Sequence, residues 1–217
     1  MSFRRYILAS RSPRRLDLLR HIVHPELIEV RAPASAEEAG FEDCPDLDSI
    51  RVRLLEIARL KAERVREELN REEADLHELP RTLLIAADTT VVVTGHHGEP
   101  MVLGQPPDHD EWREVVSEWF RHFYAGRTHL ALTAVFVTTP DGRHADRIVE
   151  TRVTIRRDIE RWLNWYLLTG EPRGKAGGYA LQGAGSVFIE QVEGSLSNVV
   201  GLPLEALLDL FAEVRLK

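Results

Sequence analysis

The sequence has very little cysteine and no long apolar run, and both absences restrict what kind of protein it can be. Cys44 is the single cysteine, so neither an intrachain disulfide nor a cysteine-based zinc site is available. No apolar stretch reaches the length needed to span a membrane. The first residues also lack the apolar core of a secretory signal peptide. We therefore expect a cytoplasmic protein that does not bind membranes.

An excess of positive charge is also missing. The 217 residues include 28 lysines and arginines against 35 aspartates and glutamates, a formal net charge of −7. A general nucleic-acid binder needs many phosphate contacts from basic side chains, so stable nucleic-acid binding is not expected. The glycine patterns of P-loop and dinucleotide-binding proteins are absent as well. The length suits one large α/β domain or two closely coupled lobes, and we predict a single domain over residues 1–217.

The first feature with chemical content lies near the start, where an apolar segment, residues 6–8, precedes Ser12 and Pro13. Ser12 suits a helix N-cap and Pro13 the first helical position, so we predict a strand followed by a capped helix. Such a helix N-terminus attracts anions. Arg14 and Arg15 in its first turn oppose the helix dipole, which indicates either an ordinary surface pair or a site for a polyanion.

A second feature is a carboxylate inside the most apolar stretch of the chain, residues 82–93. This stretch has the length and β-branched content of a strand, or a strand pair, buried on both faces. Asp88 lies in its middle, and a buried carboxylate needs a partner. We therefore predict that Asp88 meets a cation, a metal ion or backbone donors. The alternative is an Asx-type turn where the strand bends.

A long amphipathic helix is predicted over residues 49–76, and Lys61 interrupts its apolar stripe. Either the stem of Lys61 covers apolar surface while its ammonium reaches water, or the ammonium lies at the edge of a cleft. Before this helix, a predicted strand over residues 27–30 leads into a loop. Glu37 or Glu38 could hold a metal there, because ligands bind at the carboxyl ends of strands in open α/β sheets.

Antiparallel segments in the second half predict a mixed sheet rather than a purely parallel one. Two histidines at positions 96–97 lie in a glycine-flanked turn and are expected at the surface. The other expected elements are a hairpin of residues 128–139 and 148–155, a helix near residues 112–120 with Asp108 as its N-cap, a helix over 159–168, a strand over 186–192, a turn over 193–198 and a last helix over 203–214.

The segment from Gly174 to Gly185 is rich in glycine, which permits unusual backbone angles and a close approach to a ligand. Within it, Lys175 offers a mobile cation for phosphate. Gln182 offers a donor and an acceptor that suit the amide edge of a nucleobase. This segment is therefore a candidate part of a nucleotide site.

The candidate residues combine cations with carboxylates: Arg14, Arg15, Lys61 and Lys175 with Glu37 and Asp88. Cations match phosphate oxygens, and carboxylates hold a metal ion or deprotonate water. A local basic patch beside carboxylates, in an acidic protein, therefore suits a nucleoside triphosphate with Mg²⁺.

Several stretches together resemble the Maf family of nucleoside triphosphate pyrophosphatases. They are residues 8–15 (LASRSPRR), 87–89 (ADT), 175–183 (KAGGYALQG) and 197–203 (SNVVGLP), with residues 61–62 (KA) and 126–129 (GRTH) also matching. The resemblance implies an elongated mixed α/β fold, with a β-sheet flanked by helices and two lobes around a central cleft, as in inosine-triphosphatase-like proteins. It also implies cleavage of dTTP or UTP to the monophosphate and pyrophosphate, a divalent metal ion (Mg²⁺, Mn²⁺ or Co²⁺), a cytoplasmic location and, often, a homodimer.

The resemblance also implies roles for matching residues. Asp88 corresponds to the proton acceptor, with Lys61 and Lys175 as further catalytic residues. Glu37 and Asp88 correspond to metal ligands. The implied substrate-binding residues are Ser10, Arg14, Arg15, Thr89 and Gln182. Among these, Arg, Thr and Gln at positions 14, 89 and 182 match the family branch that acts on dTTP and UTP.

Two positions depart from the family pattern. Ala36 replaces the aspartate of an Asp-Glu pair, and Gln105 stands where the family has a lysine. Because Gln105 supplies no charge for phosphate, Arg127 or another cation would have to substitute for it. Three interpretations therefore remain open: a dTTP/UTP pyrophosphatase, a related enzyme acting mainly on CTP or modified nucleotides, and a nucleotide-binding regulator of cell division with little or no turnover.

Overall fold

The computed structural model describes residues 3–33, 40–72 and 81–216. The strands in these ranges are β1 (Arg5–Leu8), β2 (Ile28–Val30), β3 (Thr82–Thr94), β4 (Pro100–Leu103), β5 (Thr128–Thr138), β6 (His144–Ile155) and β7 (Ile189–Glu193). The α-helices are α1 (Pro13–Leu19), α2 (Leu47–Glu72), α3 (Trp112–Trp119), α4 (Glu160–Thr169), α5 (Leu196–Val200) and α6 (Leu204–Leu216). Short helical turns are η1 (Pro25–Leu27), η3 (Phe120–Tyr124), η4 (Ala176–Gly178) and η5 (Ala184–Phe188).

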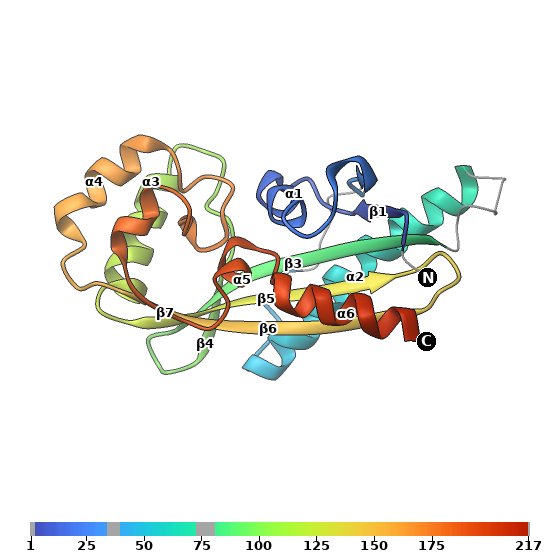
Figure 1. Ribbon diagram of the computed structural model, residues 1–217. Coiled ribbons are helices and arrows are strands. Elements are labelled where there is room, and N and C mark those ends of the chain that lie inside the picture. The colour runs from blue at the N-terminus through green and yellow to red at the C-terminus, as the bar shows by residue number, and fades with distance from the viewer. Residues whose placement is uncertain (1–2, 34–39, 73–80, 217) are drawn as a thin grey trace.

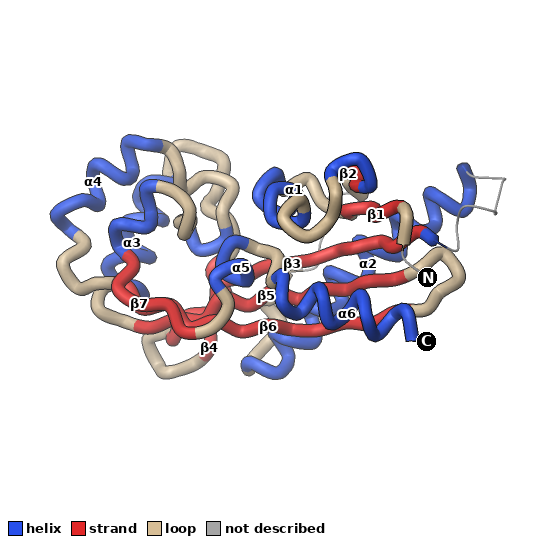
Figure 2. Tube along the Cα trace, viewed as in Figure 1, coloured by secondary structure: helices blue, strands red, loops and turns tan. Residues whose placement is uncertain are grey.

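All strands of the described ranges join one mixed sheet (Figures 1 and 2). Their order is β2-β1-β3-β5-β6-β7, and β4 pairs with β3 outside this path. β1 is parallel to both β2 and β3, whereas the other pairs are antiparallel. The mixed sheet expected from the sequence is therefore confirmed.

β3 is apolar along most of its 13 residues because both faces of the sheet are covered there. Successive side chains of a strand point to opposite faces. Leu83 and Ile85 belong to a core shared with α1 and α6, while Leu84 and Ala86 belong to a core shared with α2. The predicted strand is thus confirmed as one continuous strand buried on both faces.

The first two helices begin close to their predicted positions. Ser12 is the N-cap of α1, its hydroxyl accepts from the backbone N–H of Arg15 at 3.4 Å, and Pro13 occupies the first turn. α2 starts at Leu47 and is described as far as Glu72. The predicted continuation to residue 76 lies outside the described residues.

The long strands β3, β5 and β6 connect two ends of an elongated molecule (Figure 1). At one end α2 and α6 cover opposite faces of the sheet, and both chain termini lie there. At the other end α3, η3 and α4 pack around a separate core rich in aromatic side chains, including Phe120, Tyr124, Tyr166 and Phe188. The predicted elongated sheet flanked by helices is confirmed.

Three local predictions are wrong. Asp108 does not cap α3, because residues before Trp112 form a separate turn and the N-cap position is Glu111 without a side-chain cap. The strand predicted from residue 186 begins at Ile189, because η5 precedes it. The turn predicted over 193–198 contains the start of α5, where Ser195 accepts from the backbone N–H of Asn198 as an N-cap.

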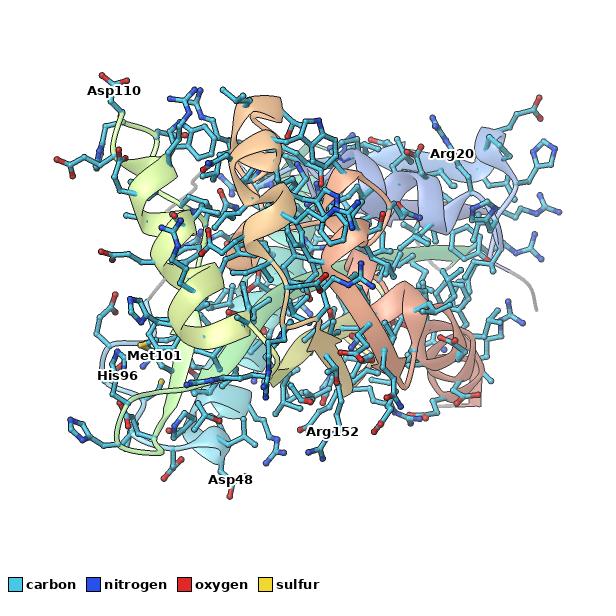
Figure 3. The ribbon with its side chains drawn as sticks, turned by 90° about the vertical axis from the view of Figure 1, so that its left-hand side faces the viewer. Arg20, Asp48, His96, Met101, Asp110 and Arg152 are labelled. Atoms are coloured by element: carbon cyan, nitrogen blue, oxygen red, sulfur yellow. The ribbon has the colours of Figure 1, made fainter. Side chains whose placement is uncertain are left out.

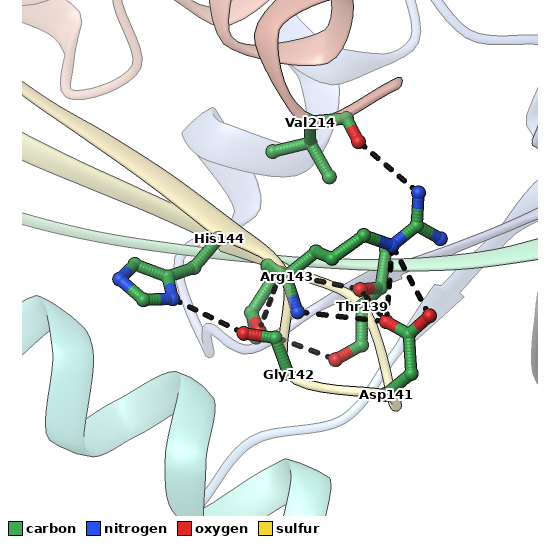
Figure 4. A network of polar contacts seen from close by, with 7 residues as sticks. Thr139, Asp141, Gly142, Arg143, His144 and Val214 are labelled. Carbon is green, nitrogen blue, oxygen red and sulfur yellow. Dashed lines mark hydrogen bonds and ion pairs between the residues drawn. The ribbon is translucent and has the colours of Figure 1, made fainter. Parts of the chain in front are cut away.

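The tip of the β5–β6 hairpin is fixed to the end of α6 by a polar network (Figure 4). The Arg143 guanidinium donates to Asp141 at 3.1 Å and to the carbonyl of Val214 at 3.3 Å. Thr139 also donates to Asp141. Burial opposes ionisation of Asp141, but the Thr139 and Arg143 hydrogen bonds outweigh it and lower the pKa of the Asp141 carboxyl. The network therefore joins the hairpin to the C-terminal helix.

In the view of Figure 3, charged and polar side chains project from the outer surface. His96 and His97 lie exposed at the β3–β4 turn, as predicted, and the labelled Asp110 points away from the protein before α3. None of the helices described combines enough length and apolar character to cross a lipid bilayer.

Candidate active site

A cleft opens on one edge of β3, between the two strands that pair with that edge. β1 pairs with residues 82–85 and β4 with residues 91–94, while β5 pairs along the opposite edge. Within the described part of the chain, no strand covers the first edge over residues 86–90. The cleft there has a volume of about 440 Å³. Its walls come from the segment after β1, from α1, α2 and α5, and from residues 174–182.

Asp88 and Lys61 meet in this cleft. Nζ of Lys61 donates to Oδ1 of Asp88 at 2.6 Å, and the two side chains are only 14% and 15% exposed. Asp88 lies on the face of β3 that α2 covers, because it follows Leu84 and Ala86 in the alternation of the strand. Of the three kinds of partner expected for Asp88, the structure shows a cation, Lys61, which also lines the cleft.

Thr89 points to the opposite face of β3 and belongs to a chain of hydrogen bonds. Nη2 of Arg15 donates to Oγ1 of Thr89 at 3.0 Å, and the same oxygen lies 3.0 Å from Oγ1 of Thr133. Thr133 donates to the carbonyl of Asn198 in α5 at 3.1 Å. Both Asp88 and Thr89 line the cleft, because the cleft extends around the open edge of the strand to both faces.

Arg15 connects the walls of the cleft to one another. Its Nε donates to the carbonyl of Gly201 at 2.9 Å, and its Nη1 donates to Oγ of Ser10 at 3.3 Å. Ser10 is 6% exposed, lines the cleft and also accepts from the backbone N–H of Ser12. Several protein oxygens therefore already engage the Arg15 guanidinium, which orders α1, Thr89 and the end of α5 around the cleft.

Another wall of the cleft is formed by the glycine loop, defined here as residues 174–185. Two buried tyrosines hold it: Tyr124 donates to the carbonyl of Gly177 at 2.9 Å, and Tyr166 donates to that of Gly178 at 3.0 Å. Gly177 has a φ of +70°, and a Cβ there would lie 2.5 Å from the Tyr124 hydroxyl and 2.8 Å from Val91. Only glycine fits this position, which explains part of the glycine content seen in the sequence.

Lys175 and Gln182 in the glycine loop both line the cleft. Gln182 is exposed within it, whereas Lys175 is partly buried and donates to the backbone carbonyl of Glu171. Burial, followed by the nearby Arg14 guanidinium, lowers the pKa of the Lys175 ammonium, while Glu171 acts in the opposite direction. Two neighbouring cations from different walls make this part of the cleft suitable for an anion.

Beneath the glycine loop lies a buried histidine. Nε2 of His129 is 2.7 Å from the hydroxyl of Tyr179, and the two side chains are 2% and 6% exposed. Burial lowers the pKa of His129 from its ordinary value of 6.5 to about 3. His129 is therefore neutral near physiological pH and supports Tyr179, which lines the cleft.

This pKa shift predicts a loss of stability in mild acid. The unfolded chain binds a proton at His129 below pH 6.5, whereas the folded protein resists protonation down to about pH 3. The contribution to the free energy of unfolding is thus complete above pH 6.5 and decreases as the pH falls towards 3. Between about pH 7.5 and about pH 5, we expect the wild type to lose about 2 kcal/mol more than His129→Gln in urea unfolding. Equal pH slopes for the two proteins would contradict a buried neutral histidine.

The structure also shows cleft cations that sequence reasoning missed. Arg64 lies one helical turn beyond Lys61 on α2 and lines the cleft, as does Arg11, whose guanidinium donates to the carbonyl of Pro33 at 3.3 Å. The spacing of three residues from Lys61 was the available signal for Arg64. Arg127, considered above as a substitute for a missing cation, is not among the residues that line the cleft.

Gln105, the position where the family has a lysine, lines the cleft. It follows β4, and the preceding carbonyl of Gly104 accepts from the backbone N–H of Gly177 at 2.9 Å. The segment after β4 is thereby attached to the glycine loop. Gln105 is exposed, so its amide is accessible from the cleft.

The carboxylates available for a metal ion are few. Across the described ranges, no three histidine, cysteine, aspartate or glutamate side chains cluster as metal ligands. Asp88 is the one carboxylate among the described residues that line the cleft, and Glu37 lies outside the described residues. Mg²⁺ is often held by one or two carboxylates together with substrate phosphates. Asp88, with cationic side chains in the same cleft, fits that kind of site.

Comparison with known proteins identifies relatives of the whole chain. A protein of Anaeromyxobacter dehalogenans named dTTP/UTP pyrophosphatase is 39% identical over 203 residues, which cover 92% of this chain and 89% of the relative. A protein of Caulobacter vibrioides with the same name is 36% identical over 208 residues, 95% and 93% of the two chains. A crystal structure of a nucleoside-triphosphatase / dITP/XTP pyrophosphatase from Mycobacterium abscessus aligns with 97% of this chain and 96% of that one, at 18% identity and a TM-score of 0.43. The profile of the family described as Maf-like protein matches residues 5–214, so this chain belongs to that family.

Proposed function

We propose that this protein hydrolyses dTTP and UTP to the nucleoside monophosphate and pyrophosphate. The observation that carries the proposal is the single cleft in which the Asp88–Lys61 pair lies together with Arg14, Lys175 and Gln182. The cleft combines a carboxylate for water, cations for phosphates and an amide for a base. The names of the two sequence relatives support the same substrates.

In the proposed reaction, a water oxygen attacks the α-phosphorus and the bond to the oxygen that bridges the α- and β-phosphates breaks. Pyrophosphate leaves, and the water proton passes to the Asp88 carboxylate. Lys61 lies 2.6 Å from Asp88 and orients that carboxylate. Arg14, Lys175 and Arg64 balance the negative charge of the phosphates from three walls of the cleft.

A divalent metal ion, Mg²⁺ or alternatively Mn²⁺ or Co²⁺, would be held by Asp88 and by the substrate phosphates, with Glu37 as a further candidate ligand. When bound, the ion would supply a Lewis acid that polarises a phosphoryl oxygen. We further propose that Ser10 and Thr89 complete the substrate site, since both line the cleft. We also propose that the reaction takes place in the cytoplasm. Sedimentation of the purified protein would show whether it forms a homodimer.

The test is pyrophosphate release by the purified protein from a panel of triphosphates: dTTP, UTP, CTP, ATP, GTP and 7-methyl-GTP, with Mg²⁺ and with EDTA. We expect release from dTTP and UTP, with the monophosphate as the other product. Preferential cleavage of CTP or a modified nucleotide would replace the proposed substrates. Phosphate as the product instead of pyrophosphate would contradict the proposed bond cleavage.

A second candidate function rests on Gln105. A neutral side chain stands at the cleft where the family carries a lysine, and this favours a nucleotide-binding regulator of cell division with little turnover. Binding of dTTP without hydrolysis of any triphosphate in the panel would support this function and exclude the enzymatic one.

Gln105→Lys is expected to strengthen substrate binding. A lysine there would add a cation that faces the cleft, and a hydrogen bond to a charged group is worth about 1.5–3 kcal/mol when well formed. Because Gln105 is exposed, we expect only the lower part of this range, a decrease of KM for dTTP by up to about tenfold at low ionic strength. Added salt should reduce the gain. An unchanged or higher KM would show that residue 105 does not contact phosphate.

A further inference from the structure

Glu171 lies between α4 and the glycine loop and contacts both ends of that loop. Its carboxylate accepts from the backbone N–H groups of Ala184 at 2.6 Å and Gly185 at 2.8 Å. The Tyr166 hydroxyl, which donates to the carbonyl of Gly178, also lies 3.3 Å from Oε1 of the same carboxylate. At the other end, the backbone carbonyl of Glu171 accepts from Nζ of Lys175. Glu171 therefore holds the end of the glycine loop through its carboxylate and holds Lys175 through its backbone carbonyl.

The carboxylate is closely fitted to this position. A Cβ at Gly183 would lie 2.2 Å from Oε2 of Glu171, so the absence of a side chain at 183 creates the space for the carboxylate. Gly183 has a φ of −129°, which other residues adopt as well, so a side chain there would displace the Glu171 carboxylate without straining the backbone. The position of the Glu171 carboxylate therefore depends on the glycine at position 183.

The hydrogen bonds from Ala184 and Gly185 to the Glu171 carboxylate are favourable because these residues begin the helical turn η5. The first N–H groups of a helical turn have no partner within the turn, and Gly183, in the N-cap position, has no side chain to supply one. The Glu171 carboxylate satisfies two of these donors with charge-assisted hydrogen bonds, which are stronger than neutral ones. The loop held in this way carries two residues that line the cleft, Lys175 and Gln182.

We propose that Glu171 is a positioning residue whose carboxylate holds Gln182 in place for the base of the nucleotide, while its backbone carbonyl holds Lys175. The carboxylate does not line the cleft, so it acts through the loop and not through contact with the substrate. The choice of substrate in this inference rests on the proposed function. The contacts of Glu171 with the glycine loop do not depend on whether the protein hydrolyses nucleotides.

The experiment compares Glu171→Gln with wild type and with Glu190→Gln, a matched change at an exposed glutamate on β7. A glutamine at 171 keeps the size of the side chain but has one acceptor oxygen fewer and no charge. We expect KM for dTTP to rise by about tenfold, and the dTTP/dGTP ratio of kcat/KM to fall by about tenfold, with kcat changed by less than about threefold. Glu190→Gln should behave as wild type.

A second variant tests the same contact from its other side. Gly183→Ala leaves Glu171 intact but displaces its carboxylate, and we expect the same loss of base preference. Hydrogen exchange should show faster exchange at Ala184 and Gly185 in both variants, and thermal melting should show both folded at the assay temperature. Faster exchange with unchanged KM and base preference would overturn the proposal, since Glu171 would then be structural only.

Failure of the proposed function is distinguishable from failure of this inference. If wild type hydrolyses no triphosphate, the comparison uses the dissociation constants of dTTP and dGTP, measured by calorimetry. A fall in the dTTP/dGTP affinity ratio in Glu171→Gln and Gly183→Ala would support the positioning role even without turnover. An unchanged ratio would overturn it.

Discussion

Asp88→Asn is expected to reduce turnover of dTTP by about a hundredfold to ten-thousandfold, because a general base contributes about 10²–10⁴-fold and asparagine cannot accept the water proton. The substitution also removes the carboxylate that we propose as a metal ligand. It preserves size, so Lys61 and the strand geometry should remain. The dissociation constant of dTTP should stay within about tenfold of wild type, because the substitution removes a negative charge from a cleft that is proposed to bind a polyanion.

The measurement is single-turnover pyrophosphate release together with calorimetric binding of dTTP. Asp110→Asn is the matched control, because Asp110 is exposed before α3, points away from the protein (Figure 3) and is not among the residues that line the cleft. A mutant at position 88 that keeps most of its turnover would show that another group accepts the proton. Loss of binding together with turnover would instead make Asp88 a binding or folding residue.

Gln182→Glu is expected to lower kcat/KM for dTTP and UTP by about ten- to a hundredfold, a loss of about 1–3 kcal/mol for a polar contact left unpaired. The glutamine amide can donate to O4 of thymine or uracil and accept from N3–H, whereas a carboxylate cannot donate. The added charge would also lie in the cleft that we propose for the phosphates. Purine triphosphates should lose much less, because adenine lacks this pair of groups and guanine presents it, as O6 and N1–H, on the ring that lies farther from the sugar.

Gln191→Glu provides the control, since Gln191 is an exposed glutamine on β7, beyond the glycine loop. The readout is the ratio of kcat/KM for dTTP to that for dGTP in each variant. A similar decrease for every base would mean that residue 182 supports the loop and does not read the base. A variant that gains activity on purine triphosphates would strengthen the assignment of Gln182 to base preference.

Several parts of the structure followed from local sequence alone. Ser12 and Pro13 specify the start of α1, because capping depends on a hydroxyl and a fixed φ within one turn. The apolar run of β3 specifies a strand with both faces covered. The buried position of Asp88 required a partner, and Lys61 stood out as a charge on an apolar stripe. Part of the chemical inventory of the cleft was therefore predictable from residue types, whereas Arg11 and Arg64 were missed.

The tertiary structure decided how these residues combine. Alternation along β3 sends Asp88 and Thr89 to opposite faces, and they share one cleft only because β1 ends at Leu8 and leaves the edge of β3 open. Arg15 is occupied by the carbonyl of Gly201, a partner far away in the sequence. Sequence periodicity reports which side chains share a face of one element. It does not report where a neighbouring strand stops or which distant carbonyl lies within hydrogen-bonding distance, and those two facts determine the shape of this site.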